Sequence, residues 1–254
     1  MKNLTAFCER QGAYLVHVST ESVGGLTPGT VPDYLTEQML FFGQLTDNQY
    51  VHSKFLAERH ILEHMTQGTL KAKIMRAGNL SPRAEDGEFQ MNMNANASMG
   101  RLKALKMLGA CPYLMLEGQM EFTPIDQAAH AMVMLSRTPL ANCVFNVSNN
   151  HIVPMDDIFM RLEKIDGKPL EYVEDEVFAK RMEAAQADPA KAQILAPLVA
   201  YQQSSSEQQG VETLASTVFT MQVLHRLGFR WDHTSSEYVD MVFEMLRTLR
   251  YFEE

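Results

Sequence analysis

The sequence predicts an α/β fold in which helices alternate with the strands of a parallel sheet. Apolar residues at helical spacing over 4–11 stop at Gly12, and a mostly apolar strand follows over 14–18. The same order then repeats, since a long helix over 48–67 precedes a second strand over 71–76. Parallel strands need a helical crossover of this kind between them, so this part of the chain is predicted to form a strand–helix–strand unit.

The remaining sequence predicts two parts of different character. The further elements expected are a Gly- and Pro-rich loop over 22–33, a polar loop over 81–94, a helix over 98–108, a segment over 122–135 that begins with a turn and becomes a helix, a strand over 144–147, a helix over 155–162, and mostly helical structure from 175 onward with a polar loop at 202–209. Residues 1–80 and 121–165 are assigned to a sheet-bearing domain, and residues 81–120 and 166–254 to a mostly helical subdomain. The first strand has no strand before it to pair with, so the sheet is expected to be truncated and to have an exposed edge.

Composition and charge exclude several classes of protein. With 254 residues, 46% of them hydrophobic, the chain is long enough to bury a core. A net charge of -9 opposes binding to nucleic acid, whose phosphates attract clustered lysine and arginine. No stretch has the roughly 18 apolar residues of a membrane span, and we expect no secretion signal. Cys8, Cys111 and Cys143 are odd in number and far apart, which favours a reducing cytoplasm and no zinc site.

The strongest local motif is a Tyr-x-x-x-Lys pair, Tyr50 and Lys54, within the predicted helix over 48–67. A spacing of four residues places the phenol and the ammonium on one helix face. The ammonium stabilises the phenolate, so Tyr50 could donate a proton to a carbonyl that gains a hydride, and Lys54 could bind a ribose hydroxyl. The alternative is structural, because a tyrosine packed on the aliphatic stem of a neighbour is common in helices.

Polar residues at the ends of the two predicted strands give this motif its context. Ser19 and Thr20 follow the first strand, and residues 76–80 end the second. Ligands of open α/β sheets bind at the carboxyl ends of strands, so a hydroxyl there could bond a substrate carbonyl. Ser and Thr also cap turns after strands, and both interpretations remain open. His60 and His64 have the spacing of a metal pair, but an exposed polar helix face is the simpler interpretation.

Longer stretches of the sequence resemble a known family. The middle section of the extended short-chain dehydrogenases is similar to residues 17–23 (HVSTESV), 48–58 (NQYVHSKFLAE) and 74–80 (IMRAGNL). Three further segments resemble, more narrowly, the thioester reductase domains that terminate nonribosomal peptide and polyketide synthetases. They are residues 86–92 (DGEFQMN), 122–126 (FTPID) and 227–231 (LGFRW). It covers nearly the whole chain, and the segments occur in the family's order.

This resemblance implies a fold, a reaction and a set of residue roles. The fold would be the C-terminal half of a Rossmann-like extended short-chain dehydrogenase with a mostly helical substrate-binding subdomain. The family's catalytic Thr, Tyr and Lys fall on Thr20, Tyr50 and Lys54, and Gly78 and Asn79 would join Tyr50 and Lys54 in binding the cofactor. The implied reaction is NADPH-dependent reduction of an acyl or peptidyl thioester, carried on the phosphopantetheine arm of a carrier protein, to an aldehyde or onward to the alcohol.

The sequence departs from the family's pattern in the segment that binds the phosphates of the cofactor. The family opens with a strand, a glycine-rich turn and a helix that hold the pyrophosphate, and neither Gly24-Gly25 nor Gly29 opens a helix of this kind. We therefore expect the chain alone to bind NADPH weakly. Two alternatives stay open: a nucleotide-sugar epimerase or dehydratase that shares the Thr, Tyr and Lys, and a non-catalytic fragment or binding module. The sequence does not predict the oligomeric state.

Overall fold

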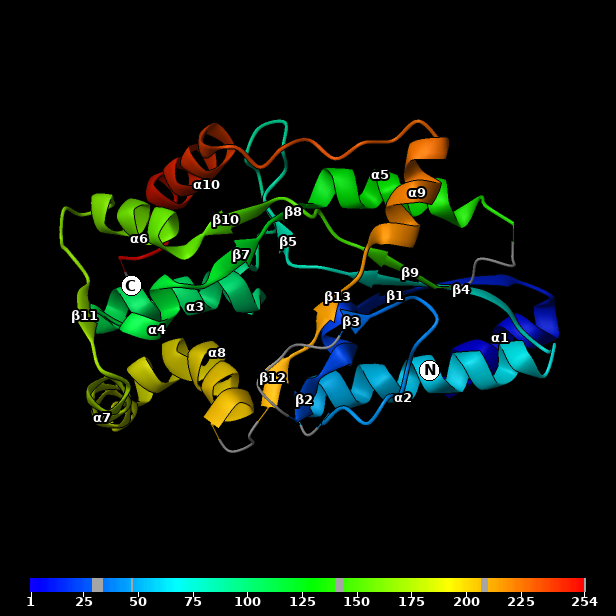
Figure 1. Cartoon of the computed structure of the whole chain (residues 1–254), viewed down its shortest axis with the longest axis horizontal. Coiled ribbons are helices and arrows are strands. Elements are labelled where there is room, and N and C mark those ends of the chain that lie inside the picture. The colour runs from blue at the N-terminus through cyan, green and yellow to red at the C-terminus, as the bar shows by residue number, and fades with distance from the viewer. Residues whose placement is uncertain (29–33, 47, 140–143, 207–209, 254) are drawn as a thin grey trace. The chain divides into compact units, whose positions relative to one another are not determined.

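The computed structural model describes residues 1–254 except 29–33, 47, 140–143, 207–209 and 254 (Figure 1). The predicted α/β fold is confirmed, and the chain divides into two compact units, each with a hydrophobic core. Unit 1 comprises Met1–Leu80, Gln127–Ser148 and Ser204–Trp231, and unit 2 comprises Ser81–Asp126, Asn149–Gln203 and Asp232–Glu254.

Unit 1 contains a three-stranded parallel sheet in the order β1-β4-β9. Its elements are α1 (Lys2–Gln11), β1 (Tyr14–Thr20), the 3-10 helix η1 (Glu21–Gly24), β2 (Leu26–Pro28), β3 (Tyr34–Leu35), α2 (Gln49–Thr66), β4 (Lys71–Ala77), α5 (Ile125–Ser136) from Gln127 onward, β9 (Val144–Val147), β12 (Gly210–Glu212), β13 (Leu214–Ala215) and α9 (Val218–Arg226). Ser19, Arg76 and Asn146 are neighbours across the three strands. The carboxyl ends of the strands therefore meet at one edge of the sheet, as the sequence predicted.

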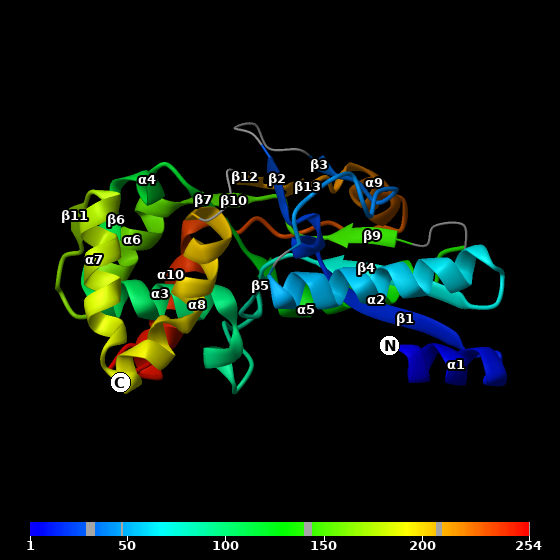
Figure 2. The same ribbon diagram turned by 90° about the horizontal axis from the view of Figure 1, so that it is seen from below.

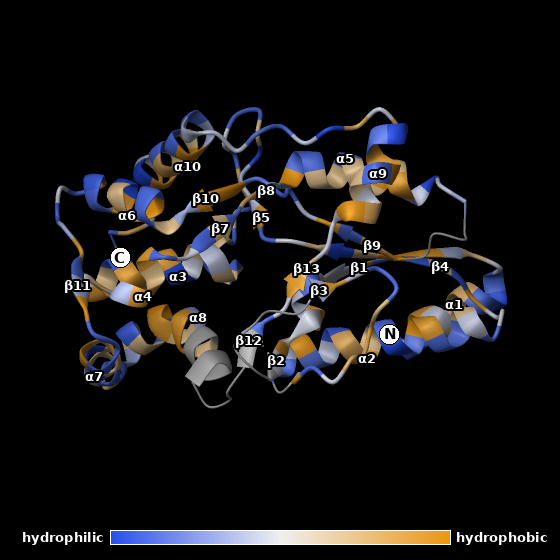
Figure 3. Ribbon diagram, in the orientation of Figure 1, coloured by the Kyte–Doolittle hydropathy of each residue, from blue (hydrophilic) through white to orange (hydrophobic). Residues whose placement is uncertain are grey.

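Helices cover both faces of this sheet (Figures 1 and 2). Cys8 of α1 and Ile61 of α2 pack with Leu15 against one face. Ala131 of α5 and Leu224 of α9 belong to the cluster on the other face. Polar and apolar residues alternate along α2 and α5 (Figure 3), as expected for helices that bury one side.

The helix ends follow from local sequence. Gly12 ends α1 with a left-handed φ of 62°, which glycine adopts without a steric penalty. Asn48 begins α2, because its side-chain oxygen accepts hydrogen bonds from Tyr50 N at 2.9 Å and Val51 N at 3.3 Å. The predicted helix over 48–67 and the predicted strand over 71–76 are thus confirmed to within a residue at each end.

Strand β1 forms an edge of the sheet of unit 1, because in the described residues it pairs with β4 alone. The apolar side chains of Tyr14, Val16 and Val18 are 40%, 39% and 49% exposed. These three residues alternate along the strand and so share one face. The sequence expectation of an exposed apolar sheet edge is confirmed for the part of the chain that the structure describes.

The glycine-rich segment after β1 is not one continuous loop. It contains η1 and β2, and residues 29–33 of the predicted loop lie outside the described residues. Gly25 has a φ of 56°, and a Cβ atom there would lie 2.1 Å from the carbonyl oxygen of Leu45. Only glycine allows this close backbone approach. The short strands β2 and β3 pair with β12 and β13, so the segment is held by residues far along the chain.

Unit 2 is mostly helical and contains two short strand pairs, β6 with β11 and β7 with β10. Its elements are η2 (Met93–Ala95), α3 (Ala97–Leu108), β6 (Ala110–Pro112), α4 (Tyr113–Leu116), β7 (Gln119–Glu121), β8 (Thr123–Pro124), β10 (Ile152–Pro154), α6 (Met155–Lys164), β11 (Glu171–Val173), α7 (Asp175–Gln186), α8 (Pro189–Ser206) up to residue 203, and α10 (Ser236–Thr248), while β5 (Leu80–Ser81) lies at the boundary with unit 1. Phe122, Phe159, Phe178, Val242 and Leu246 are buried in its core.

The division into units differs from the domain boundaries expected from sequence after residue 80. Residues 204–231 belong to unit 1 because β12, β13 and α9 pack there, whereas the sequence assigned them to the helical subdomain. Residues 121–126 and 149–165, assigned by sequence to the sheet-bearing domain, belong to unit 2. The loop predicted at 202–209 is wrong over residues 202–206, since α8 extends through Ser206, and residues 207–209 lie outside the described residues. No described helix is both long and apolar enough to cross a lipid bilayer.

Candidate active site

The Tyr-x-x-x-Lys pair lies in the first turns of α2, beside the carboxyl end of β1. Lys54 Nζ is 5.8 Å from the centroid of the Tyr50 ring and donates a hydrogen bond to the Val18 carbonyl oxygen at 3.4 Å. The side chain of Tyr50 is 55% exposed. The lysine therefore connects α2 to the strand end and holds a positive charge next to an accessible phenol.

Thr20 is the last residue of β1, two positions after the carbonyl that Lys54 binds. Its hydroxyl oxygen accepts a hydrogen bond from Ser22 N at 3.2 Å and donates to Ser22 Oγ at 3.1 Å. Thr20 is thus the N-cap of η1, which is the capping role that the sequence left open. Because the contact with Ser22 Oγ is exposed, the hydroxyl can exchange that partner for a carbonyl oxygen.

Gly78 and Asn79 follow β4 at the same sheet edge. Gly78 directly follows Ala77, which is the Cα partner of Thr20, and Gly78 N donates to the Val147 carbonyl oxygen of β9 at 3.2 Å. Gly78 is half-buried and Asn79 is exposed. The structure therefore places all five residues of the candidate site within unit 1: three lie at strand ends or just beyond them, and two lie on the first turns of α2.

A buried ion pair behind this site was not singled out from the sequence. Arg76 of β4 and Glu58 of α2 are both 0% exposed, and Arg76 Nε and Nη2 donate to the Glu58 carboxylate at 2.8 to 3.1 Å. Arg76 also donates to the carbonyl oxygens of Thr36 at 3.2 Å and Met39 at 2.8 Å. One guanidinium thus ties α2, β4 and the segment after β3 together. Strand β4 also carries Lys71 and Lys73, so its sequence did not mark Arg76 as a buried, paired charge.

His60 and His64 join α2 to α1 and do not form an exposed polar face. His60 Nε2 lies 2.8 Å from Thr5 Oγ1, and His64 Nδ1 lies 2.6 Å from Glu9 Oε1. Both histidines are half-buried. Among the described residues no group of three His, Cys, Asp or Glu side chains is placed to hold a metal ion.

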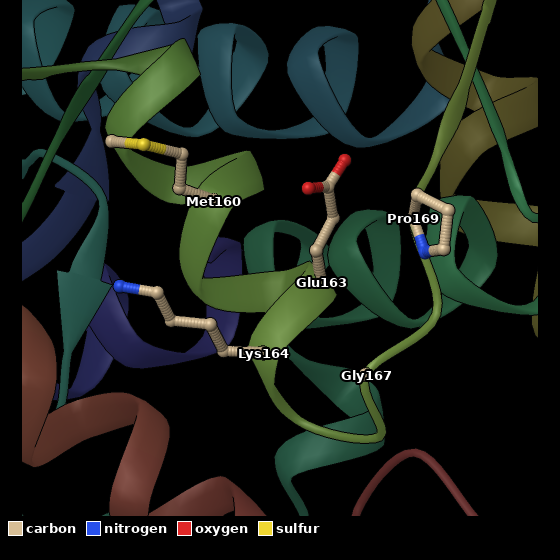
Figure 4. Close-up of a pocket in the computed structure, with 5 residues that line it drawn as sticks. All are labelled: Met160, Glu163, Lys164, Gly167 and Pro169. Carbon is tan, nitrogen blue, oxygen red and sulfur yellow. The ribbon is translucent and has the colours of Figure 1, made fainter.

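A surface depression of about 280 Å³ in unit 2 carries no catalytic set. It is lined by Met160, Glu163, Lys164, Gly167 and Pro169 (Figure 4). Glu163 Oε1 already accepts hydrogen bonds from the backbone N–H of Leu170 at 3.0 Å and from the Tyr172 hydroxyl at 3.2 Å. This carboxylate therefore stabilises the local fold.

Comparison with known proteins agrees with this geometry. Residues 1–132 match the NAD-binding family described as male sterility protein, which is more than half of the chain. The chain belongs to this family. No curated protein matches it. The family's description supports a nicotinamide cofactor, and the segment matched includes β1, α2 and β4, on which all the candidate residues lie or border.

Solved structures extend the likeness of this NAD-binding family member beyond residue 132. A thiolation-reductase di-domain from an archaeal non-ribosomal peptide synthetase is 31% identical with a TM-score of 0.79, over 99% of this chain and 52% of that chain. The reductase domain of the aureusimine biosynthetic cluster shares the fold with a TM-score of 0.79 at 23% identity, over 98% of this chain and 64% of that one. The chain thus spans about half to two thirds of these structures. The predicted resemblance to thioester reductases is confirmed.

An epimerase likeness is weaker. UDP-glucuronic acid 4-epimerase from Bacillus cereus matches with a TM-score of 0.60 at 14% identity, over 98% of this chain and 66% of that chain. This level of likeness shows a common fold.

Proposed function

We propose that this chain carries the catalytic residues for reducing a thioester carbonyl with a nicotinamide cofactor. The observation that supports it is the placement of the Lys54 ammonium, fixed by Val18 O at the end of β1, beside the half-exposed ring of Tyr50. A bound reduced nicotinamide supplies the hydride. The chain's own residues must then stabilise and protonate the oxygen that gains charge.

Each residue has a distinct role in this proposal. Tyr50 donates its phenolic proton to the developing alkoxide, which gives a hemithioacetal, and Lys54 stabilises the phenolate that remains. The phenolate takes the hydroxyl proton back as the C–S bond breaks, so the aldehyde forms and the thiol leaves with that proton. Thr20 donates a hydrogen bond to the same oxygen and so polarises the carbonyl, in exchange for its bond to Ser22 Oγ. An ammonium N–H of Lys54 that Val18 O does not engage donates to a hydroxyl of the cofactor ribose, and the backbone at Gly78 and Asn79 borders the nicotinamide.

The residues present fit the ribose and nicotinamide end of the cofactor. Lys54 and Tyr50 offer an ammonium and a hydroxyl on one exposed helix face, which suits a ribose diol. Gly24 and Gly25 do not form a phosphate cradle, because Gly25 packs against the Leu45 carbonyl oxygen. We infer NADPH as the cofactor from the family resemblance, and we expect this chain alone to bind it weakly.

The substrate proposed is an acyl or peptidyl thioester on the phosphopantetheine arm of a carrier protein. The likeness to a thiolation-reductase di-domain supports this partner. A reducing cytoplasm suits the reaction, and Cys8 and Cys111, the unpaired cysteines of the described residues, are both buried.

Steady-state oxidation of NADPH with an acyl-pantetheine thioester tests the proposal. NADPH is supplied at about millimolar concentration, because a cofactor held mainly at one end binds weakly. Tyr50→Phe should lower turnover by about 10²- to 10⁴-fold. Lys54→Ala should lower turnover and NADPH affinity together, whereas Thr20→Val should lower turnover with affinity kept.

Tyr113→Phe is the matched control, since it removes an exposed hydroxyl from unit 2. It should leave turnover unchanged. Thioester-independent oxidation, or near-full turnover by Tyr50→Phe, would overturn the proposal. A UDP-sugar in place of the thioester tests the epimerase alternative, and its conversion would favour that function.

A further inference from the structure

The face of β1 that packs against α2 carries polar groups next to the candidate active site. Alternate side chains of a strand share a face, so Leu15, His17 and Ser19 point to one side of the sheet. Leu15 shares a core cluster with Ile61 of α2, and Ser19 is 4% exposed. His17 lies between these two residues, beneath α2.

Helix α2 crosses this face in the direction opposite to β1. Its residue Ile61 packs in one cluster with Leu15 near the start of the strand, whereas Lys54 Nζ reaches the Val18 carbonyl oxygen near the end. Moving forward along β1 therefore means moving backward along α2. His17 consequently faces the stretch of α2 between Ile61 and Lys54.

The charges around His17 agree with this placement. Burial lowers the pKa of His17 below its ordinary value of 6.5, and the Lys54 ammonium lowers it further. The Glu58 carboxylate acts in the opposite sense, and the amino group of Met1 adds a smaller lowering effect. Arg76, the buried cation of β4, is already paired with Glu58. His17 is therefore a neutral imidazole at pH 7, with one donor and one acceptor nitrogen.

Two buried polar atoms on this face have no hydrogen-bond partner among the described residues. They are His17 Nε2 and Ser19 Oγ. Buried polar atoms are nearly always satisfied by protein or by ordered water, and two of them two residues apart on one strand face offer a site for the same water. Val18, whose carbonyl oxygen binds Lys54, lies between them in the sequence.

We propose that His17 is a positioning residue for Lys54, and that it acts through a water molecule held by His17 Nε2, Ser19 Oγ and Lys54 Nζ. Val18 O accepts a hydrogen bond from one ammonium N–H, and the water accepts one from a second. The ammonium is thereby fixed beside Tyr50, with its third N–H directed to a ligand. The inference deepens the proposed function and rests on it for its kinetic consequences.

Nitrogen-15 NMR of the imidazole rings tests the coupling without any need for turnover. Lys54→Met removes the positive charge near His17, so the pKa of His17 should rise toward its ordinary value. Lys71→Met, which removes an exposed lysine from the start of β4, is the control and should leave the His17 titration unchanged. An unchanged His17 in Lys54→Met would overturn the inference.

Kinetics separate a positioning role from a purely structural one. His17→Leu should lower turnover by about 10-fold or more, because it removes a hydrogen bond that orders a charged group. His17→Gln keeps a hydrogen-bonding side chain and should restore most of that loss. Turnover of the unmodified chain should also fall as pH drops through the lowered pKa of His17, since a second cation then faces Lys54, and His17→Gln should lack this fall.

His225→Gln, at an exposed histidine of α9, is the control for these variants and should match the unmodified chain. Equal losses in His17→Leu and His17→Gln, with the pH profile unchanged, would show a structural role and overturn the inference. The proposed function fails separately, by near-full turnover of Tyr50→Phe. An inactive Tyr50→Phe alongside a fully active His17→Leu would remove only the role of His17.

Discussion

The two halves of α2 hold their side chains in different ways. In the first turns Tyr50 is 55% exposed, and Lys54 contacts the sheet through one hydrogen bond of 3.4 Å to a backbone oxygen. In the turns that follow, Glu58 and Ile61 are 0% exposed, the former in an ion pair with Arg76 and the latter in the core. The helix thus has an open half that can meet ligands and an anchored half that fixes its position.

This difference shows how the fold can support chemistry on an exposed surface. A catalytic side chain must keep its place without burying the groups that react. The anchored half of α2 provides this, because its ion pair and its apolar contacts fix the helix one turn away from Lys54. The open half then needs few contacts of its own.

The largest effect on the free energy of unfolding is expected from a substitution in the anchored half of α2. Glu58→Gln removes the charge that compensates Arg76 at a site with no solvent access, and breaking a buried pair in this way costs about 3–5 kcal/mol of unfolding free energy. Tyr50→Phe, one exposed hydroxyl on the same helix, should change it by less than about 0.5 kcal/mol. Urea denaturation followed by circular dichroism measures both.

The double variant Glu58→Leu with Arg76→Met is the control for this comparison. Replacing both partners by apolar side chains leaves no unpaired buried charge, so much of the lost stability should return. Equal urea midpoints for Glu58→Gln and Tyr50→Phe would contradict the distinction between the two halves of α2.

Sequence periodicity predicted the long elements of unit 1 because their pattern is local. Apolar spacing and Asn48 located α2, and an apolar run located β4. The strand ends, with Thr20 and Gly78, followed from the order of these elements. These features depend on residues close together in the chain.

The parts that sequence did not predict depend on contacts between distant residues. Strand β2 spans only Leu26–Pro28 and exists because it pairs with β12, far along the chain. The pairing of Arg76 with Glu58 and the burial of Lys73 need the packed sheet, in which Lys73 Nζ donates to the carbonyl oxygen of Leu135 at 2.8 Å and so caps the end of α5. A charged side chain in a strand is exposed in most sequences, so its composition alone gave no such signal.

A second prediction extends the contrast between anchored and open surfaces to β1. Its inner face is held under α2, whereas Tyr14, Val16 and Val18 form an exposed row on a strand that, within the described part of the chain, pairs with β4 alone. The chain should self-associate through this edge, and Val16→Lys should suppress the association because a charge resists strand pairing. Light scattering across a concentration series measures it.

Val133→Lys provides the control, since Val133 of α5 is 52% exposed but lies on a helix. It should leave the association unchanged. If the unmodified chain stays monomeric at all concentrations, the edge of β1 is protected in solution.

The smallest effect expected concerns the contact between α1 and the end of α2, where the anchored half meets solvent. The Thr69 hydroxyl donates to Glu9 Oε1 at 2.5 Å, and this bond, followed by that of His64 at 2.6 Å, lowers the pKa of Glu9 below its ordinary value of 4.5. A carboxylate with a lowered pKa in the folded state stabilises the fold above its unfolded pKa and loses that contribution as pH falls through the folded value. Glu9→Gln should therefore lower the Tm slightly at pH 6, and the difference from the unmodified chain should vanish in acid below the folded pKa.

Thermal unfolding at a series of pH values measures this difference in Tm. Glu183→Gln on α7 is the control for loss of a surface carboxylate. A Tm difference that persists unchanged into acid would show that the ionised form of Glu9 does not anchor α1.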